Sequence, residues 1–369
     1  MKIAFFTEAY LPYQSGVAIS IATFACDLAK LGHDVRIYAP SYPAHKDNIS
    51  NPSCFRFFSI PLGYPGFRTA IPYHINFAKD LTDFDPDIIH SHHPFQMGKL
   101  AQKWANKLKI PLFYTFHTLF TEYLHVIPFF KKDFLSKYII NKIKKYCDKC
   151  NCVIAPTEQA KGVLEIKYNI NTKIEVLPTG IDLSCFKKAL PKKAPINKQL
   201  IHVGRISKEK NIEFLLEVLL KLPTDIKLLI VGDGPAREPL EKRVEAKKLQ
   251  ERVSFVGAKP REKLPDFFNL ADIFVTASKT ETQGLVFMEA KAAALPTVAI
   301  KAAGAINMVK DNQDGFLTTN DIDIFAAKIR QLYADHNLYN IFSREALNHV
   351  EKFSSQNMAK RLLEIYNTN

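Results

Sequence analysis

The amino-acid sequence predicts an α/β protein with two doubly wound, Rossmann-like domains that face each other across a cleft. Its 369 residues exceed one ordinary core and suit two domains of about 170 to 190 residues. Short apolar strand patterns alternate with helical patterns twice along the chain, which indicates two parallel sheets covered on both faces. We expect one domain at residues 1–190 and a second at 191–354, with a last helix at about 355–369 packing back onto the first.

The first alternation begins with the apolar run Lys2–Thr7, which has the length of a buried strand. A loop rich in proline and glycine follows at Leu11–Val17, and Gly32 ends the helix pattern over Ser20–Leu31. The alternation continues with a helix at Lys99–Leu108 and with strands at Asp34–Tyr38, Ile88–His90, Leu112–Thr115 and Cys152–Ala155.

The second alternation begins after Pro191–Lys198, where prolines and lysines without periodicity indicate an interdomain linker. It contains a helix at Asn211–Leu222 and strands at Gln199–Val203, Lys227–Val231, Val253–Val256, Ile273–Thr276 and Thr297–Ile300. Ligands of such sheets bind beyond the carboxyl ends of the strands, so the loops there are the candidate sites.

Composition excludes several classes of protein. No apolar run approaches the roughly 20 residues of a membrane helix, and Glu8 interrupts the first apolar run too early for an export signal. The cysteines Cys147, Cys150 and Cys152 lack a second zinc knuckle, which favours core thiols over a metal site. Reduced thiols without an export signal indicate a cytoplasmic protein. The net charge of +13 attracts polyanions, so nucleic acid, anionic membranes and phosphorylated substrates all fit it.

Basic residues at a strand end predict a phosphate site. Gly204 and Arg205 follow the strand Gln199–Val203, and Lys210 precedes the next helix, so a guanidinium fork and an ammonium can converge on a pyrophosphate. Taken singly, these charges equally fit a solvated loop; together with Gly284 and Leu285 they favour phosphate.

The turn Gly232–Pro235 follows the next strand. Arg237 stands where a dinucleotide fingerprint has its third glycine, so we expect Gly234 to line a nucleotide cleft without forming that fingerprint.

Two glutamates eight residues apart, Glu281 and Glu289, flank Gln283, Gly284 and Leu285. A carboxylate accepts two hydrogen bonds from a vicinal diol, as in a sugar or a ribose. The glycine lets backbone N–H groups approach a phosphate at a helix N-terminus. This segment therefore predicts sugar, phosphate and ribose contacts together.

Histidines and aspartates in the first half suggest other chemistry. His117 follows a strand and is the candidate for bonding a sugar hydroxyl or a leaving phosphate, with a backbone-satisfied histidine as the alternative. His90, His92 and His93 lack a nearby carboxylate that would complete a metal site. Turn chemistry explains Asp83, Asp85 and Asp87. We expect no metal, because Arg205 and Lys210 can neutralise the phosphate.

The basic segment Phe129–Cys150 is amphipathic, with Leu135, Ile139, Ile143, Tyr146 and Cys150 on one face. Such a helix fits an anionic lipid surface and an ordinary domain helix equally well, and the aromatic residues upstream tilt the balance toward lipid. The lysines expected to face lipid are Lys131, Lys132, Lys142, Lys144 and Lys145.

Together the glycine, basic and acidic motifs resemble the retaining glycosyltransferases of family 4, which have the GT-B fold. The resemblance runs over nearly the whole chain and rests on Glu281 and Glu289, on Gly204, Arg205 and Lys210, on Gly232–Pro235 and on the loop at Gly16. Glu8–Pro12, Ser15–Val17 and Phe116–Tyr123 are most similar to the lipid-acceptor branch, which includes diacylglycerol glucosyltransferases.

The resemblance implies a role for each position. Arg205 and Lys210 would hold the donor diphosphate, Glu281 the transferred sugar and Glu289 the ribose. Gln283, Gly284 and Leu285 would present their backbone to the donor. Gly16 would let its loop approach the β-phosphate, and His117 would meet the sugar near its reacting carbon.

We therefore expect a metal-independent, cofactor-free, retaining glycosyltransferase that moves a hexose, glucose from UDP-glucose, to a membrane lipid such as diacylglycerol. It would bind peripherally to the inner face of the cell membrane and would not bind nucleic acid. One alternative is a mannosyltransferase that uses GDP-mannose and a phosphoinositide or soluble glycan. Another is a non-enzymatic binder of polyanions, possible on charge alone.

Overall fold

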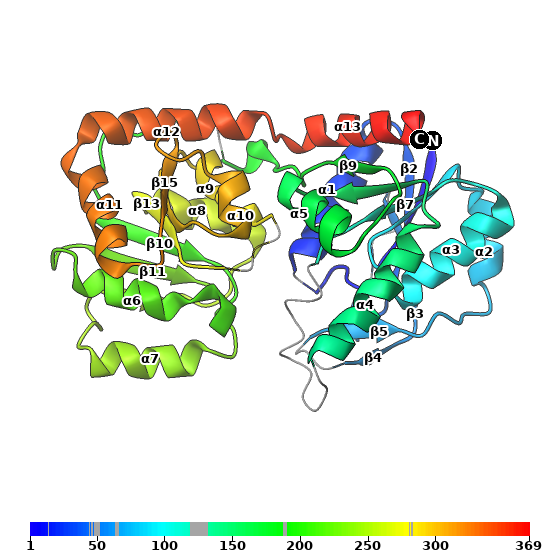
Figure 1. The fold of residues 1–369 in the computed structure, drawn as a ribbon, viewed down its shortest axis with the longest axis horizontal. Helices are drawn as coiled ribbons and strands as arrows, with labels where there is room; N and C mark the ends of the chain where they lie inside the picture. Colours follow the sequence, from blue (N-terminus) through cyan, green and yellow to red (C-terminus); the bar gives the residue numbers. More distant parts are fainter. Residues whose placement is uncertain are drawn as a thin grey trace. The chain divides into compact units, whose positions relative to one another are not determined.

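The structure is a computed structural model with two compact units, Met1–Gly180 together with Ser355–Asn369, and Ile181–Ser354 (Figure 1). It describes residues 1–369 except 14, 44, 46, 48–51, 63–65, 119–131, 187–189, 280 and 282, and also leaves out the side chains of 132–134 and 303. Both units are α/β, and each contains a parallel sheet.

The first unit contains a seven-stranded parallel sheet in the order β3-β2-β1-β6-β7-β8-β9. The strand order reverses between β1 and β6, so a ligand-binding crevice is expected at the carboxyl ends of those two strands. Its strands are β1 (Lys2–Phe6), β2 (Asp34–Pro40), β3 (Ser53–Phe57), β6 (Ile88–Ser91), β7 (Leu112–Thr115), β8 (Cys152–Ala155) and β9 (Ile174–Val176).

Helices cover both faces of this sheet. Helices α1 and α13 lie side by side, and Tyr366 of α13 stacks edge-on against Phe113 of β7 (Figure 1). The opposite face packs against the remaining helices in one core that includes Phe6, Tyr114 and Ile143. The helices are α1 (Gly16–Lys30), α2 (Phe77–Phe84), α3 (Gln96–Leu108), α4 (Lys132–Cys147), α5 (Glu158–Gly162), the π-helical turn Val163–Lys167, and α13 (Ser355–Thr368).

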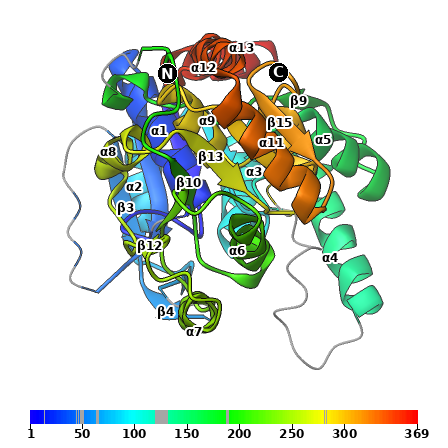
Figure 2. The same cartoon turned by 90° about the vertical axis from the view of Figure 1, so that its left-hand side faces the viewer.

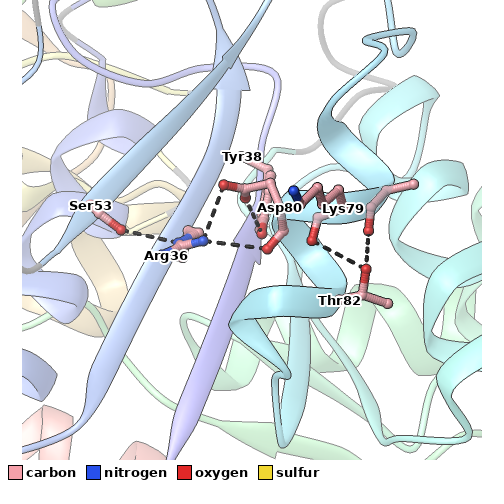
Figure 3. Close-up of polar contacts among 7 residues, drawn as sticks. Arg36, Tyr38, Ser53, Lys79, Asp80 and Thr82 are labelled. Carbon is pink, nitrogen blue, oxygen red and sulfur yellow. Dashed lines mark hydrogen bonds and ion pairs between the residues drawn. The ribbon is translucent and has the colours of Figure 1, made fainter.

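One acidic side chain fastens α2 to the sheet (Figure 3). Asp80 of α2 accepts hydrogen bonds from Arg36 Nη1 at 3.1 Å and from the Tyr38 hydroxyl at 2.9 Å, both on β2. Arg36 also donates to Ser53 Oγ of β3 at 3.3 Å, and Thr82 Oγ1 donates to the Lys79 carbonyl within α2. The edge of the sheet and its covering helix are thus joined by one polar network.

The sheet of the second unit is also parallel and has the order β12-β11-β10-β13-β14-β15, with its reversal between β10 and β13. Alternate residues of one strand enter different cores: Leu200 packs on one face of the sheet and Ile201 on the other. The strands are β10 (Gln199–Val203), β11 (Lys227–Val231), β12 (Val253–Phe255), β13 (Ile273–Thr276), β14 (Thr297–Ile300) and β15 (Gly315–Thr318).

Helices again cover both faces, and Figure 2 shows α9 above the strands and α6 below them. The core on one face includes residues of α6, α7 and α11, and that on the other includes residues of α8, α9 and α10. These helices are α6 (Ile212–Leu220), α7 (Arg237–Ala246), α8 (Leu264–Asn269), α9 (Leu285–Ala292), α10 (Ala303–Met308), α11 (Ile322–Ala334) and α12 (His336–Glu351). Short 3-10 turns occupy Leu183–Phe186, Lys208–Lys210 and Arg261–Lys263.

The division between units differs from the sequence prediction, which placed it after residue 190. The chain passes between units at 180/181 and again at 354/355, and Ile181 N–H donates to the Phe353 carbonyl at 2.9 Å. The segment 191–198 is irregular, as the sequence predicted, but it is bound to the second unit. The carboxylate of buried Asp272 accepts from the backbone N–H groups of Ile196, Asn197 and Gln199.

Three further expectations can be compared with the described residues. The cysteines at 147, 150 and 152 are buried free thiols, which confirms the core interpretation. Asp85 ends α2 in a left-handed conformation and Asp87 accepts from the Lys2 N–H at 2.7 Å, so these aspartates serve turns. In the part of the chain that is described, no helix has the length and apolarity to cross a membrane.

Asp272→Ala is expected to destabilise the second unit by about 2–4 kcal/mol, because three backbone donors lose a charged acceptor. Asp225→Ala is the control, since this exposed carboxylate makes one long contact of 3.9 Å with Lys198 and is expected to contribute less than about 0.5 kcal/mol. Thermal unfolding followed by circular dichroism compares the two variants. Equal midpoints would show that Asp272 does not secure segment 191–198.

Candidate active site

The loops after β10, β11 and β13 carry most of the residues that the sequence singled out. They leave the sheet at its carboxyl edge, next to the reversal between β10 and β13. Ligands of doubly wound sheets bind at this position. Of the predicted residues, nine lie in this unit: Gly204, Arg205, Lys210, Gly234, Glu281, Gln283, Gly284, Leu285 and Glu289.

Hydrogen bonds between the first two loops continue beyond the ends of their strands. Gly204 N–H donates to the Val231 carbonyl at 3.0 Å, and Ile206 N–H donates to the Asp233 carbonyl at 2.9 Å. A Cβ at position 232 would lie 1.9 Å from the Gly204 carbonyl oxygen, so only glycine permits this approach. The loop that carries Arg205 is therefore held firmly against the Gly232–Pro235 turn.

Arg237 explains why that turn lacks a third glycine. Its guanidinium binds Asp233 at 3.2 Å and Glu241 at 2.7 Å, which ties the turn to the first part of α7. These side-chain contacts add to the close backbone packing of Gly232 and Gly234 that holds the turn. This agrees with the prediction of a tight turn rather than a dinucleotide fingerprint.

Lys210 and Glu281 form an ion pair between the turn after β10 and the loop after β13. Both side chains are mostly buried, and the sequence predicted different contacts for them, diphosphate for the lysine and sugar for the glutamate. In the unliganded protein they neutralise each other. A ligand that carries both phosphate and hydroxyl groups can replace each partner with one of matching chemistry.

A left-handed glycine begins the helix between the two glutamates. Gly284 has φ of +76° and precedes Leu285, the first residue of α9. A Cβ at 284 would lie 2.7 Å from the ring of Phe287, so a larger residue would be both strained and crowded. Gln283 is buried beside it.

Glu289 is buried on α9, and Arg261 approaches its Oε1 at 3.3 Å. Burial raises the pKa of Glu289, and the opposing charge of Arg261 lowers it by a smaller amount. A buried carboxylate that retains acceptor capacity suits a pair of hydroxyl donors. The sequence analysis missed Arg261, which stands in a 3-10 turn far along the chain with no motif around it.

A second buried network holds α9 in place. Lys291, two residues beyond Glu289, forms an ion pair with Asp314, and Asp314 Oδ2 contacts His349 Nδ1 at 2.6 Å on α12. Burial lowers the pKa of Lys291 to about 8, and Asp314 acts in the opposite direction. Removing one member of such a network leaves an uncompensated buried charge, so the helix that carries Glu289 is strongly anchored.

In the first unit, His117 lies in a stack of imidazole rings. Its Nε2 and His92 Nδ1 are 3.0 Å apart, and His92 also stacks on His90. Burial is the main cause that holds the pKa values of His92 and His117 well below the usual range, and neighbouring histidines add to it. The lowered pKa favours the neutral imidazole for His117, which besides its contact with His92 can donate or accept one hydrogen bond.

The other histidines have partners within the fold. His90 contacts the Tyr366 hydroxyl at 2.6 Å and Thr115 Oγ1 at 2.7 Å, and His93 Nδ1 accepts from the Glu8 N–H at 3.1 Å. Glu8 itself accepts from the Met97 N–H, and burial raises its pKa. Across the described residues there is no group of three or more His, Cys, Asp and Glu side chains that suits a metal ion.

Gly16 differs from its predicted setting in a loop. It is the first residue of α1, because Ser15 Oγ accepts from the Ala18 N–H at 3.2 Å and caps the helix four residues before the predicted start at Ser20. Apart from its chain neighbours and the backbone of its own helix, no described protein atom lies within 4 Å of where a Cβ at 16 would be. The fold itself therefore does not require glycine there.

The basic segment contains a core helix. Ile143 and Tyr146 of α4 are buried in the first unit's core, while Lys142 and Lys145 are exposed. Lys144 donates to the Asn169 carbonyl and lies 3.6 Å from Asp148. Lys131, Phe120, Tyr123, Phe129 and Phe130 lie outside the described residues, as does the Lys132 side chain.

Glu289→Gln is expected to stabilise the unliganded protein, increasingly so as the pH rises. Burial raises the folded-state pKa of Glu289, so the stability that its proton provides is present below the unfolded pKa and is lost as pH rises through the folded pKa. Glutamine has no such proton. We expect the variant's advantage in thermal midpoint to grow by on the order of 2 °C between pH 4 and pH 8. A variant that is less stable than the parent at pH 8 would contradict this account.

Comparisons with known proteins cover both units. The family model "Glycosyltransferase Family 4" matches residues 14–184, and "Glycosyl transferases group 1" matches residues 186–349. The chain is 30% identical to an alpha-monoglucosyldiacylglycerol synthase of Streptococcus pneumoniae, over 99% of this chain and 85% of that protein. It is 33% identical to the protein of the same name from Acholeplasma laidlawii, over 81% of this chain and 80% of that one.

Other relatives have different names or are more distant. A GDP-mannose-dependent alpha-mannosyltransferase of Corynebacterium glutamicum is 28% identical over 86% of this chain and 76% of that protein. The fold is similar to that of sucrose-phosphate synthase from Thermosynechococcus elongatus, with a TM-score of 0.82 and 21% identity over 100% of this chain and 98% of that one. The chain belongs to the family 4 glycosyltransferases of the GT-B fold.

Proposed function

We propose that this enzyme transfers glucose from UDP-glucose to a membrane lipid of the diacylglycerol type, with retention of configuration and without a metal. The observation that carries the proposal is its similarity, at 30% and 33% identity over most of the chain, to two alpha-monoglucosyldiacylglycerol synthases. The donor residues of the second unit support it, because they combine cationic and diol-binding groups at one sheet edge.

In this proposal, the donor replaces the ion pair between Lys210 and Glu281. Lys210 and Arg205 take the diphosphate, and Glu281 takes hydroxyls of the sugar. Glu289 binds the ribose hydroxyls from its buried position on α9. The backbone at Gln283, Gly284 and Leu285 faces the donor, and the turn at Gly204 and Gly234 lines the nucleotide.

Catalysis then rests on positioning and on the charge of the leaving diphosphate. Arg205 and Lys210 stabilise that charge as the glycosidic bond to the phosphate breaks. The lipid hydroxyl attacks the anomeric carbon on the face from which the diphosphate departs and gives its proton to the departing phosphate oxygen, which retains the anomeric configuration. His117, as a neutral imidazole, orients the sugar near its reacting carbon, and Gly16 leaves room for the β-phosphate.

A second candidate keeps the same site and changes the substrates. The similarity to a GDP-mannose-dependent alpha-mannosyltransferase favours mannose transfer to a phosphoinositide or soluble glycan. Because the chain belongs to a glycosyltransferase family, the other alternative, a non-enzymatic binder of polyanions, is set aside. For the first candidate, a lipid acceptor places the enzyme peripherally on the cytoplasmic face of the membrane.

Incubation with radiolabelled UDP-glucose and diacylglycerol vesicles is expected to yield labelled glycolipid, whereas GDP-mannose in parallel yields none. Retention is checked by assigning the anomer of the product by NMR. UDP is expected to raise the thermal midpoint more than GDP or ADP does, because ligands that bind the folded state stabilise it. Labelled product from GDP-mannose alone would replace the proposal with the mannosyltransferase. No labelled lipid from any nucleotide sugar would refute both.

Lys210→Ala is expected to lower kcat by about 100-fold or more, since it removes a positioned charge at the leaving group. Lys208→Ala is the matched control: it lies on the same 3-10 turn, is exposed, and is expected to change kcat less than twofold. Equal activity of the two variants would remove Lys210 from the mechanism. Thermal midpoints of both variants, measured in parallel, separate loss of catalysis from loss of folding.

A further inference from the structure

The first unit carries a short antiparallel pair of strands, β4 (Ser59–Pro61) and β5 (Arg68–Ala70), whose position Figure 1 shows. Exposed apolar side chains lie on this pair and on the residues next to it. Nine large apolar side chains of this unit are exposed among the described residues, and six of them lie between residues 58 and 75. We call these six the apolar hairpin surface: Phe58, Ile60, Leu62, Ile71, Tyr73 and Ile75.

The hairpin that carries this surface is fixed to the unit. Ser59 and Ala70 pair across the strands and are buried, and Arg68 Nε donates to Ser59 Oγ at 2.7 Å. Ile71 N–H donates to the Phe58 carbonyl at 2.8 Å, which extends the pairing beyond β5. The exposed apolar side chains therefore stand on an ordered base.

The segment beyond β5 is held in the same way. Tyr73 N–H donates to the Ile71 carbonyl at 2.7 Å, and the ring of His74 lies edge-on against Phe55 of β3 at 4.9 Å. Tyr73 and Ile75, on either side of that anchored histidine, are 80% and 85% exposed. Ordered apolar side chains that gather on one short segment mark an interaction site.

The charged residues of segment 52–79 indicate what kind of partner this surface binds. From Pro52 to Lys79 the sequence contains no aspartate or glutamate, and Arg68, His74 and Lys79 lie within it; Arg56 is already paired with Asp47. A second copy of the chain would place these basic groups against one another, which is unfavourable. An anionic lipid surface complements them, and a tyrosine beside aliphatic side chains suits the boundary between headgroups and acyl chains.

We propose that the apolar hairpin surface inserts into the headgroup region of an anionic lipid bilayer. The inference rests on the proposed function, since an enzyme with a lipid acceptor has to dock on the surface that holds it. The exposed lysines Lys142 and Lys145 of α4 add long-range attraction, which salt screens. The apolar contact adds affinity that persists in high salt.

Co-sedimentation with vesicles of phosphatidylglycerol and phosphatidylcholine, without donor or diacylglycerol, tests the proposal. Ile75→Ser is expected to weaken binding about tenfold at both low and high salt, from burial of one aliphatic side chain. Ile166→Ser is the matched control, because Ile166 is the same residue in the same unit and is 86% exposed. It is expected to change binding less than twofold.

Glutamine at both Lys142 and Lys145 is expected to weaken binding at low salt only.

Equal binding by the Ile75 and Ile166 variants, and likewise by Tyr73→Ser, would overturn the proposal. Sedimentation velocity gives a second test. If Ile75→Ser converted a dimer into a monomer while lipid binding stayed intact, the surface would bind a second copy of the chain and the proposal would also be overturned. The proposed function is judged separately, by glycolipid formation in detergent micelles. Glycolipid formed there with no effect of Ile75→Ser on vesicle binding rejects only the docking surface. Loss of vesicle binding without any glycolipid product supports the docking surface and rejects the function.

Discussion

The approach of two backbone loops at the carboxyl edge of the second sheet is the constraint on which the candidate donor site depends. Hydrogen bonding between the loops after β10 and β11 continues past the strands, and it leaves no space for a Cβ at residue 232. Arg205 is therefore presented from a backbone that is fixed on both sides. Positioned charge of this kind does not need to reorganise when a leaving group becomes more negative.

The charges of the site are balanced before any ligand is present. Lys210 is paired with Glu281, and Arg261 approaches Glu289, so neither carboxylate is left without an opposite charge. Glu289 still carries a desolvation penalty, which the raised pKa reports. The anchored position of α9, secured through Lys291 and Asp314, keeps that carboxylate buried in spite of the penalty.

Sequence periodicity predicted five of the seven strands of the first sheet and five of the six of the second, because buried parallel strands are continuous apolar runs. Periodicity did not predict β3, β9 and β15, which lie at sheet edges. It also missed β4 and β5, which are three residues long, and it missed Arg261, whose partner Glu289 is remote in sequence. The network of Lys291, Asp314 and His349 likewise joins side chains that only the tertiary fold brings together. The domain boundary differed because Ile181 and Phe186 pack into the core of the second unit, so the chain enters that unit before the irregular segment 191–198.

The low pKa values of the first unit's histidines bear on the source of charge in the proposed reaction. His117 is bonded to His92 within a buried stack, and protonating either ring would place a cation beside other imidazoles in a poorly solvated position. In the proposed reaction, His117 would therefore serve as a hydrogen-bonding group and not as a positive charge. Neutralising a departing diphosphate would then fall to Arg205 and Lys210, so the proposal assigns orientation to residues of the first unit and electrostatic stabilisation to residues of the second.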